Sequence, residues 1–121
     1  MTKNGKAHPL PITPLMREIL ERRCEGLEPE QELFARVSAE RLARAAMVVG
    51  APRFMLHDLR KMLATVGQKV GIGDAVLRRL LNHTPARADV LHRHYVALDA
   101  EDARKPLTLV QERLVALMRA A

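Results

Sequence analysis

The chain has 121 residues, of which 48% are hydrophobic and 28% are charged, a balance typical of one globular domain with its own core. Its longest aliphatic run, residues 45–49, is far shorter than the ~20 apolar residues that a membrane-spanning helix needs, and its first residues do not resemble a signal segment. We therefore expect a cytoplasmic protein with no membrane partner. The single cysteine, Cys24, excludes an intramolecular disulfide and cysteine-based zinc modules.

The charge is basic and unevenly distributed. Lys and Arg number 20 against 14 Asp and Glu, giving a net charge of +6, and residues 53–95 hold eight of these cations, three of the anions and four of the five histidines. A polyanion is the partner that such a segment favours. Two Phe, one Tyr and no Trp are too few for the stacking platforms of single-strand binders. The composition therefore predicts double-stranded DNA as the partner.

The first half of the chain predicts a fragmentary β-hairpin and two helices. An Asn-Gly pair within residues 2–12 is typical of a type I′ hairpin turn, although so few residues precede it that we expect the natural domain to begin further upstream. Thr13-Pro14 predicts an N-cap and a first helical residue, with the helix running up to Gly26. After a Glu-rich loop, Ser38 is the predicted cap of a second helix, which a Gly-Ala-Pro sequence ends.

The second half predicts four more helices. From Leu56 to Val70 the apolar residues recur every three or four positions, and we expect the leucines at 56, 59 and 63 to face the core. After a Gly-Ile-Gly break, Asp74 is the predicted cap of a helix with four inward residues (Val76, Leu77, Leu80 and Leu81). A basic helix is expected over residues 88–97. A last amphipathic helix, with Pro106 near its start or at a kink, is expected to reach the C-terminus.

Three short motifs in the basic segment are candidates for chemistry. His57 and Arg60 are three residues apart, so both would lie on one side of a helix within reach of one phosphate; alternatively, His57 is a cap and Arg60 a surface cation. A Leu-Leu-Asn-His sequence ends at His83, a weak signal by itself. The only tyrosine, Tyr95, stands in a His-Arg-His-Tyr sequence, and a lone tyrosine is more often a packing residue.

The chain resembles the catalytic domain of the tyrosine recombinase (phage integrase) family in the order of its motifs: a lysine in a hairpin turn, His-x-x-Arg, Leu-x-His and then a tyrosine. Residues 56–65, 80–84 and 93–96 are similar to that family's second catalytic, Leu-Leu-Gly/Asn-His and nucleophile motifs, and the start of the chain is similar to its lysine hairpin. The resemblance implies a mainly α, multi-helix integrase-like fold in one N-terminally incomplete catalytic domain over residues 1–121. The expected parts are a hairpin remnant (1–12), a helical catalytic core (13–98) and a C-terminal helix (99–121).

The resemblance also implies the role of each candidate catalytic residue. Tyr95 would attack a DNA phosphodiester to form a 3′-phosphotyrosyl bond, which conserves the ester energy and needs neither cofactor nor metal. Arg60 and His83 would stabilise charge on the phosphoryl oxygens, and His57 would accept the tyrosine proton or orient the phosphate. Lys3 would protonate the departing 5′-oxygen, with Lys6 as the alternative.

Six further cations are expected to contact the DNA: Lys6, Lys61, Arg78, Arg79, Arg87 and Arg93. The family has another catalytic arginine upstream of the lysine hairpin, and no position here can take that role. Removal of one transition-state donor typically costs ~10²–10³ in rate, so we expect this chain alone to be weak or inactive. The resemblance further implies self-association on DNA through the C-terminal helix.

Other classes of function remain open. The two helices around the Gly-Ile-Gly break are compatible with a non-catalytic helix-turn-helix regulator that places Arg78 and Arg79 in the major groove, for which Tyr95 would have no use. A helical module that binds another protein through its last helix is a third hypothesis. A metal site at the histidines of residues 83–94 is disfavoured, because no carboxylate or thiolate stands beside them at ligand spacing.

Overall fold

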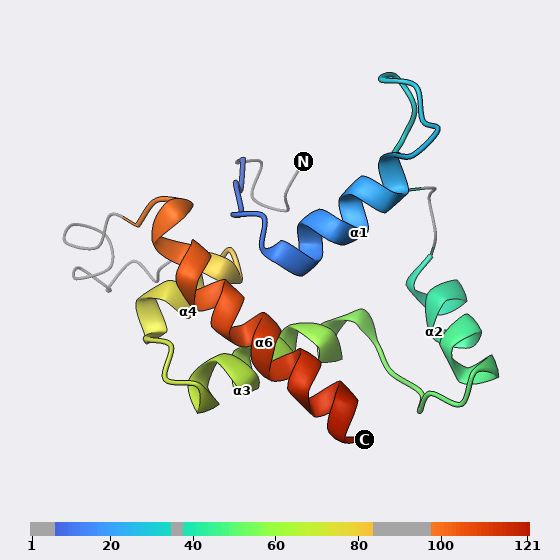
Figure 1. Cartoon of the computed structure of the whole chain (residues 1–121). Helices are drawn as coiled ribbons and strands as arrows, with labels where there is room; N and C mark the ends of the chain where they lie inside the picture. The colour runs from blue at the N-terminus through green and yellow to red at the C-terminus, as the bar shows by residue number, and fades with distance from the viewer. Residues whose placement is uncertain (1–6, 35–37, 84–97) are drawn as a thin grey trace.

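The computed structural model describes residues 7–34, 38–83 and 98–121, and this part of the chain is mainly α-helical, as predicted (Figure 1). Its helices, in chain order, are α1 (Pro14–Cys24), α2 (Ala39–Val48), α3 (Leu56–Lys69), α4 (Asp74–Leu80), the 3-10 helix η1 (Glu101–Ala103) and α6 (Arg104–Ala120). Residues 7–12, the described part of the predicted hairpin, form no strand, so the hairpin is not confirmed. The helix expected over residues 88–97 lies outside the described residues.

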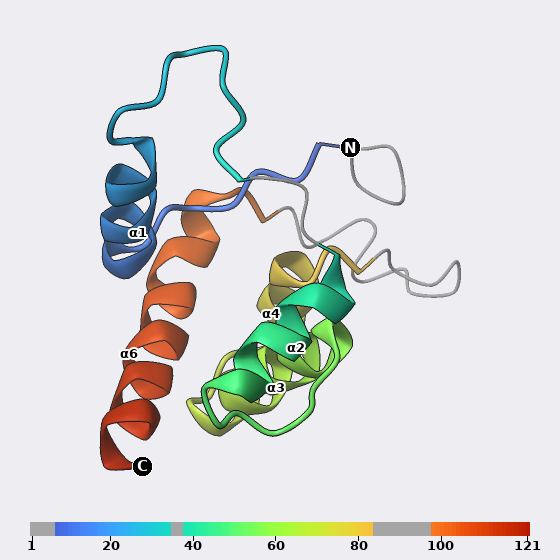
Figure 2. The same ribbon diagram turned by 90° about the vertical axis from the view of Figure 1, so that its right-hand side faces the viewer.

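The core lies where α6 crosses α3 and where α4 packs against η1. Figure 1 shows α6 running across α3, and Figure 2 shows the two helices next to each other, with the start of α1 close to α6 in both views. The buried apolar residues come from all of these helices except α1: Val66, Leu77, Leu80, Ala103 and Val110. This is a small core, formed by the C-terminal half of α3, by α4 and by the first half of α6.

The close approach of α3 and α4 depends on a glycine. Gly67 is buried in α3, and a Cβ at this position would overlap the side chain of Leu77 in α4. Gly71, with a φ of +83°, lies in the left-handed region that favours glycine and ends α3. The Gly-Ile-Gly break predicted from the sequence is thus confirmed, and it folds α4 back onto α3.

The predicted helix starts are largely right, but α1 and α4 are not capped by the side chains predicted from the sequence. The Ser38 side chain accepts a hydrogen bond from the backbone N–H of Arg41 at 3.2 Å, as an N-cap does. Thr13, by contrast, is almost completely buried and its side chain does not cap α1. At α4 the N-cap is Gly73, and Asp74, predicted as the cap, is the first residue of the helix.

The start of α1 is capped from α6 instead. The Thr13 hydroxyl donates to Oε1 of Gln111, and the same oxygen accepts the backbone N–H of Leu15 at 3.0 Å. One side chain of α6 therefore satisfies both a buried hydroxyl and an unpaired amide at the first turn of α1. Thr13 does not cap the helix because Gln111, from a distant part of the chain, accepts the hydrogen bond that a local cap would accept.

The prediction that the start of α3 faces the core is wrong. Leu56 is 47% exposed and Leu59 is 43% exposed, and no described residue from 38 to 65 is buried. The reason is that α4 and α6 cover only the C-terminal half of α3, and Figure 1 shows α2 apart from the other helices. The inward prediction for α4 is confirmed at Leu77 and Leu80, which are 4% and 8% exposed.

None of the helices in the described ranges has the length and apolar character that crossing a membrane requires.

Candidate functional site

The C-terminal end of α4 forms a Schellman motif that leads into His83. The backbone N–H of His83 donates to the Arg78 carbonyl at 2.9 Å, and that of Asn82 donates to the Arg79 carbonyl at 3.1 Å. Asn82 has a φ of +52°, the left-handed conformation that this motif requires at the residue after the C-cap and that Asn tolerates better than most side chains. The motif fixes the backbone of His83, which is exposed.

Arg60 of α3 reaches this same helix end. Its Nη2 donates a hydrogen bond to the carbonyl oxygen of Leu81, the C-cap residue of α4. Carbonyls at a helix C-terminus carry partial negative charge, which favours a guanidinium there. Because Leu81 precedes His83 by two residues, this contact brings the His-x-x-Arg and Leu-Leu-Asn-His motifs together although 21 residues separate Arg60 from Leu81.

His57 lies one turn before Arg60, near the start of α3, and is exposed. The alternative that it caps the helix is not supported, because Asp58 accepts the backbone N–H of Met55 at 2.8 Å and so takes the capping role. His57 also borders a pocket of about 400 Å³ between α2 and the segment before α3, together with Arg53. Its ring is therefore accessible to a ligand.

Two of the predicted DNA-binding cations take part in exposed ion pairs. Nζ of Lys61 lies 3.8 Å from Oδ1 of Asp58, and Nε of Arg78 lies 2.7 Å from Oδ2 of Asp74. Pairs of this kind contribute about 0 to 1 kcal/mol. Lys61, whose side chain is largely exposed, can exchange its carboxylate for a phosphate at little cost.

Arg79, the third predicted cation in this part, holds the chain before α1. Its Nη1 lies 2.7 Å from Nδ1 of His8, and its Nη2 donates to the Pro9 carbonyl at 2.8 Å. Nε2 of His8 in turn lies 3.3 Å from the carbonyl oxygen of Leu80. His8 is therefore half-buried against the end of α4.

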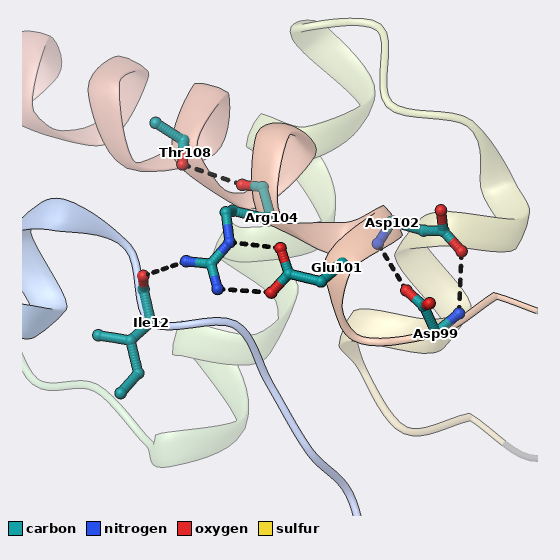
Figure 3. A network of polar contacts seen from close by, with 6 residues as sticks. All are labelled: Ile12, Asp99, Glu101, Asp102, Arg104 and Thr108. Atoms are coloured by element: carbon teal, nitrogen blue, oxygen red, sulfur yellow. Dashed lines mark hydrogen bonds and ion pairs between the residues drawn. The ribbon is translucent and has the colours of Figure 1, made fainter.

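A second arginine holds the same segment at its other end, as Figure 3 shows. Nη1 of Arg104 donates to the Ile12 carbonyl at 2.8 Å, while Nε and Nη2 contact the two carboxylate oxygens of Glu101 at 2.8 and 2.6 Å. Asp99 and Asp102 accept each other's backbone N–H at 2.9 Å, which closes the turn before α6. The segment from His8 to Thr13 is thus fixed at both ends.

In the described part of the chain, Glu101 and Arg104 are the residues whose pKa values are clearly shifted. The hydrogen bonds from Arg104 lower the pKa of the Glu101 carboxyl below its usual value, and the hydrogen bonds to Glu101 raise the pKa of the Arg104 guanidinium. Both effects stabilise the charged forms. The exposed pair therefore remains ionised across the neutral range.

The remaining predicted site residues are Tyr95, Lys3, Lys6, Arg87 and Arg93, and all lie outside the described residues. Of the candidate catalytic residues, the structure brings together Arg60 and the backbone that carries His83, with His57 on the same helix as Arg60. Within the described ranges no three His, Cys, Asp or Glu side chains are grouped as metal ligands would be. His92 and His94 are not among those residues.

Another pocket lies between α1 and α6 and offers little chemistry. It has a volume of about 220 Å³ and is lined by apolar side chains of α1, α6 and Leu63 of α3. Its two polar residues, Thr13 and Gln111, are hydrogen-bonded to each other. We therefore place the candidate site at the end of α4.

Sequence reasoning missed three parts of this site. The Leu81 carbonyl and the His8 ring have no local signal, because each is defined by a contact with a distant part of the chain. Asn82 did carry a signal, since Asn after the last apolar residues of a helix is typical of a left-handed C-terminal residue. That reading would have predicted the fixed backbone before His83.

No protein-family model matches the chain, and neither a curated protein nor a solved structure is significantly similar to it. The order of the motifs and the geometry at the end of α4 are therefore the observations that bear on function.

Proposed function

We propose that this protein is a DNA strand transferase of the tyrosine recombinase type, with Tyr95 as the nucleophile and duplex DNA as the substrate. The observation that carries the proposal is the hydrogen bond from Arg60 to the Leu81 carbonyl. It joins two motifs that the resemblance assigns to one active site, and it does so through α3 and α4, which no local sequence pattern brings together.

The chemistry assigned to the site is a transesterification. The Tyr95 oxygen attacks phosphorus, the bond to the 5′-oxygen breaks, and the DNA 3′ end becomes a phosphotyrosyl ester. The tyrosine proton passes to His57, and the 5′-oxygen takes a proton from Lys3 or Lys6. Reversal of these steps rejoins the strand without a nucleotide cofactor.

Arg60 and His83 are the proposed donors to the phosphoryl oxygens. A guanidinium has five N–H donors, and the contact with Leu81 occupies the Nη2 group, so donors remain for a phosphate. That contact also limits the conformations of Arg60, and a donor held in place before the reaction stabilises the transition state more effectively. Lys61 and Arg78, at the surface of the same two helices, are the proposed contacts to the flanking backbone.

The C-terminal helix is the proposed surface for self-association on DNA. Near the end of α6, Leu117 is 44% exposed and Met118 is 66% exposed. Apolar side chains grouped in this way at a helix end are typical of a surface that packs against another protein. The same helix contributes Val110 to the core, so the two ends of α6 have different roles in this proposal.

A helix-turn-helix regulator is the second candidate, because α3, the four-residue connection and α4 do form two packed helices. Two observations favour the first candidate instead. The second helix has only seven residues, and Arg79, one of its two expected base or phosphate contacts, is bound to His8 and Pro9. In a regulator this arginine would be turned toward the groove.

A nicked duplex tests the proposal, because cleavage near the nick releases a short fragment and traps the covalent product. We expect a slowly accumulating protein–DNA adduct that survives denaturation. The adduct should be absent from Tyr95→Phe, which retains the ring and loses the attacking oxygen. Arg60→Ala should form it ~10²–10³ times more slowly.

Arg119→Ala is the matched control, since this residue is also an exposed arginine on a helix but lies at the far end of α6. Its rate should equal that of the unchanged chain. Salt-dependent duplex binding without any adduct, both from the unchanged chain and from a version extended upstream to supply the further arginine, would contradict the strand-transferase proposal and favour the regulator.

A further inference from the structure

The contact between His8 and Arg79 uses the polar groups of both side chains. Nη1 and Nη2 of Arg79 are directed at Nδ1 of His8 and at the Pro9 carbonyl, at 2.7 and 2.8 Å. Nε2 of His8 faces the Leu80 carbonyl at 3.3 Å. Three contacts therefore join residues that are about 70 positions apart in the chain.

These contacts indicate which ring nitrogen of His8 donates and which accepts a hydrogen bond. A guanidinium only donates hydrogen bonds, so Nδ1 of His8 must accept and carries no proton. Nε2 then carries the proton and donates it to the Leu80 carbonyl. The geometry thus points to the Nε2–H tautomer of the His8 ring.

The contacts of His8 with Arg79 and Leu80 lie at the same end of α4 as the candidate site. His8 uses the Leu80 carbonyl, Arg60 uses the next carbonyl, that of Leu81, and His83 follows two residues later. The segment that begins at His8 is also held at its other end by Arg104. A displacement at the His8 end would therefore move the chain relative to Arg60 and His83.

We propose that His8 and Arg79 are positioning residues, which form a clamp that fixes the segment before α1 to the helix end bearing the candidate site. This inference rests on the proposed function, in which Lys3 or its alternative Lys6, both shortly before His8 in the sequence, protonates the departing 5′-oxygen. It also changes the role of Arg79, which acts through His8 and Pro9 and not as a contact to DNA.

The first test concerns the clamp alone and uses the full chain without DNA. Long-range ¹H–¹⁵N NMR spectra of the histidine rings should show His8 as the Nε2–H tautomer, and Arg79→Ala should change its Nδ1 resonance. In thermal denaturation, the destabilisation in the His8→Ala, Arg79→Ala double variant should be smaller than the sum of the two single effects, because both remove the same contacts. A ring found in the Nδ1–H form, or additive effects, would overturn the clamp.

The second test concerns its role in the site and uses the nicked duplex at saturating DNA. His8→Ala and Arg79→Ala should each slow adduct formation ~10- to 100-fold, the scale of a small misplacement of a reacting group, and the double variant should be no slower than either. The salt dependence of duplex affinity should stay unchanged in both. Arg17→Ala, an exposed arginine of α1, is the control that should retain the full rate.

Rescue distinguishes positioning from a contact to DNA. His8→Asn keeps an acceptor toward Arg79 and a donor toward the Leu80 carbonyl, so it should recover most of the rate. If Arg79→Ala lowers the salt slope by about 1 while His8→Ala leaves the rate unchanged, Arg79 is a phosphate contact and the inference is wrong. If neither the unchanged chain nor the version extended upstream forms an adduct, the proposed function and the positioning role fail together, whereas the NMR result still reports on the clamp.

Discussion

The two halves of α3 have the same apolar periodicity and very different surroundings. In the C-terminal half, Val66 is 6% exposed and Gly67 lies against Leu77. In the N-terminal half, Leu56 and Leu59 are more than 40% exposed, and His57 and Arg60 stand beside them. The two halves of this one continuous helix therefore have different roles. The C-terminal half packs in the core, and the N-terminal half presents side chains of the candidate site.

The largest effect should come from removing the α4 leucine that packs against the C-terminal half of α3. Leu77→Ala should lower the free energy of unfolding by about 2–5 kcal/mol, because it removes a buried side chain and leaves a cavity. Leu59→Ala is the matched variant in the exposed half and should cost under about 1 kcal/mol. Urea denaturation followed by circular dichroism measures both, and equal losses would show that the two halves of α3 are equally packed.

A smaller effect should follow from adding one methyl group to the packed half. Gly67→Ala should destabilise the fold by about 1–2 kcal/mol, since the overlap with Leu77 outweighs the ~1 kcal/mol that alanine gains over glycine in a helix. Combining it with Leu77→Ala makes room for the methyl group, so the double variant should lose less than the sum of the single variants. Additive losses in the same urea experiment would mean that the two residues do not touch.

The smallest effect on stability should come from the exposed ion pair of Glu101 and Arg104 at the start of α6, which lies outside the apolar core. Because the pKa of Glu101 is lowered in the fold, its ionised carboxylate stabilises the protein above the usual pKa of 4.5. This stabilisation is lost as the pH falls through the pKa that Glu101 has in the folded protein. Glu101→Gln should thus be slightly less stable than the unchanged chain at pH 7. The two melting temperatures should converge in acid, and a difference that persists at pH 2 would contradict this cause.

Local sequence signals predicted most of the helix boundaries. Thr13-Pro14 and Ser38 mark starts that the structure confirms, and Gly71 marks a true break, because each depends on backbone preferences of a few neighbouring residues. Burial at Leu56 and Leu59 was predicted wrongly, since a helical period shows which residues share a face and not whether another element covers that face.

The candidate site was predictable only in part. The pairing of His57-x-x-Arg60 with Leu80-Leu81-Asn82-His83 came from the resemblance, and the Arg60 contact gives it a geometric basis. The His8 clamp depends on a tertiary contact across about 70 residues, for which no local pattern exists. Tyr95, Lys3, Lys6, Arg87 and Arg93 stay predictions.

The central claim, that the end of α4 with Arg60 is where DNA phosphate binds, is tested most directly by the salt dependence of duplex affinity. Each phosphate contact contributes about 0.9 to the slope of log affinity against log salt concentration. We expect Arg60→Ala to reduce the slope by about 1 and Arg119→Ala to leave it unchanged. Equal slopes for all three proteins, or an affinity that does not depend on salt, would contradict the account.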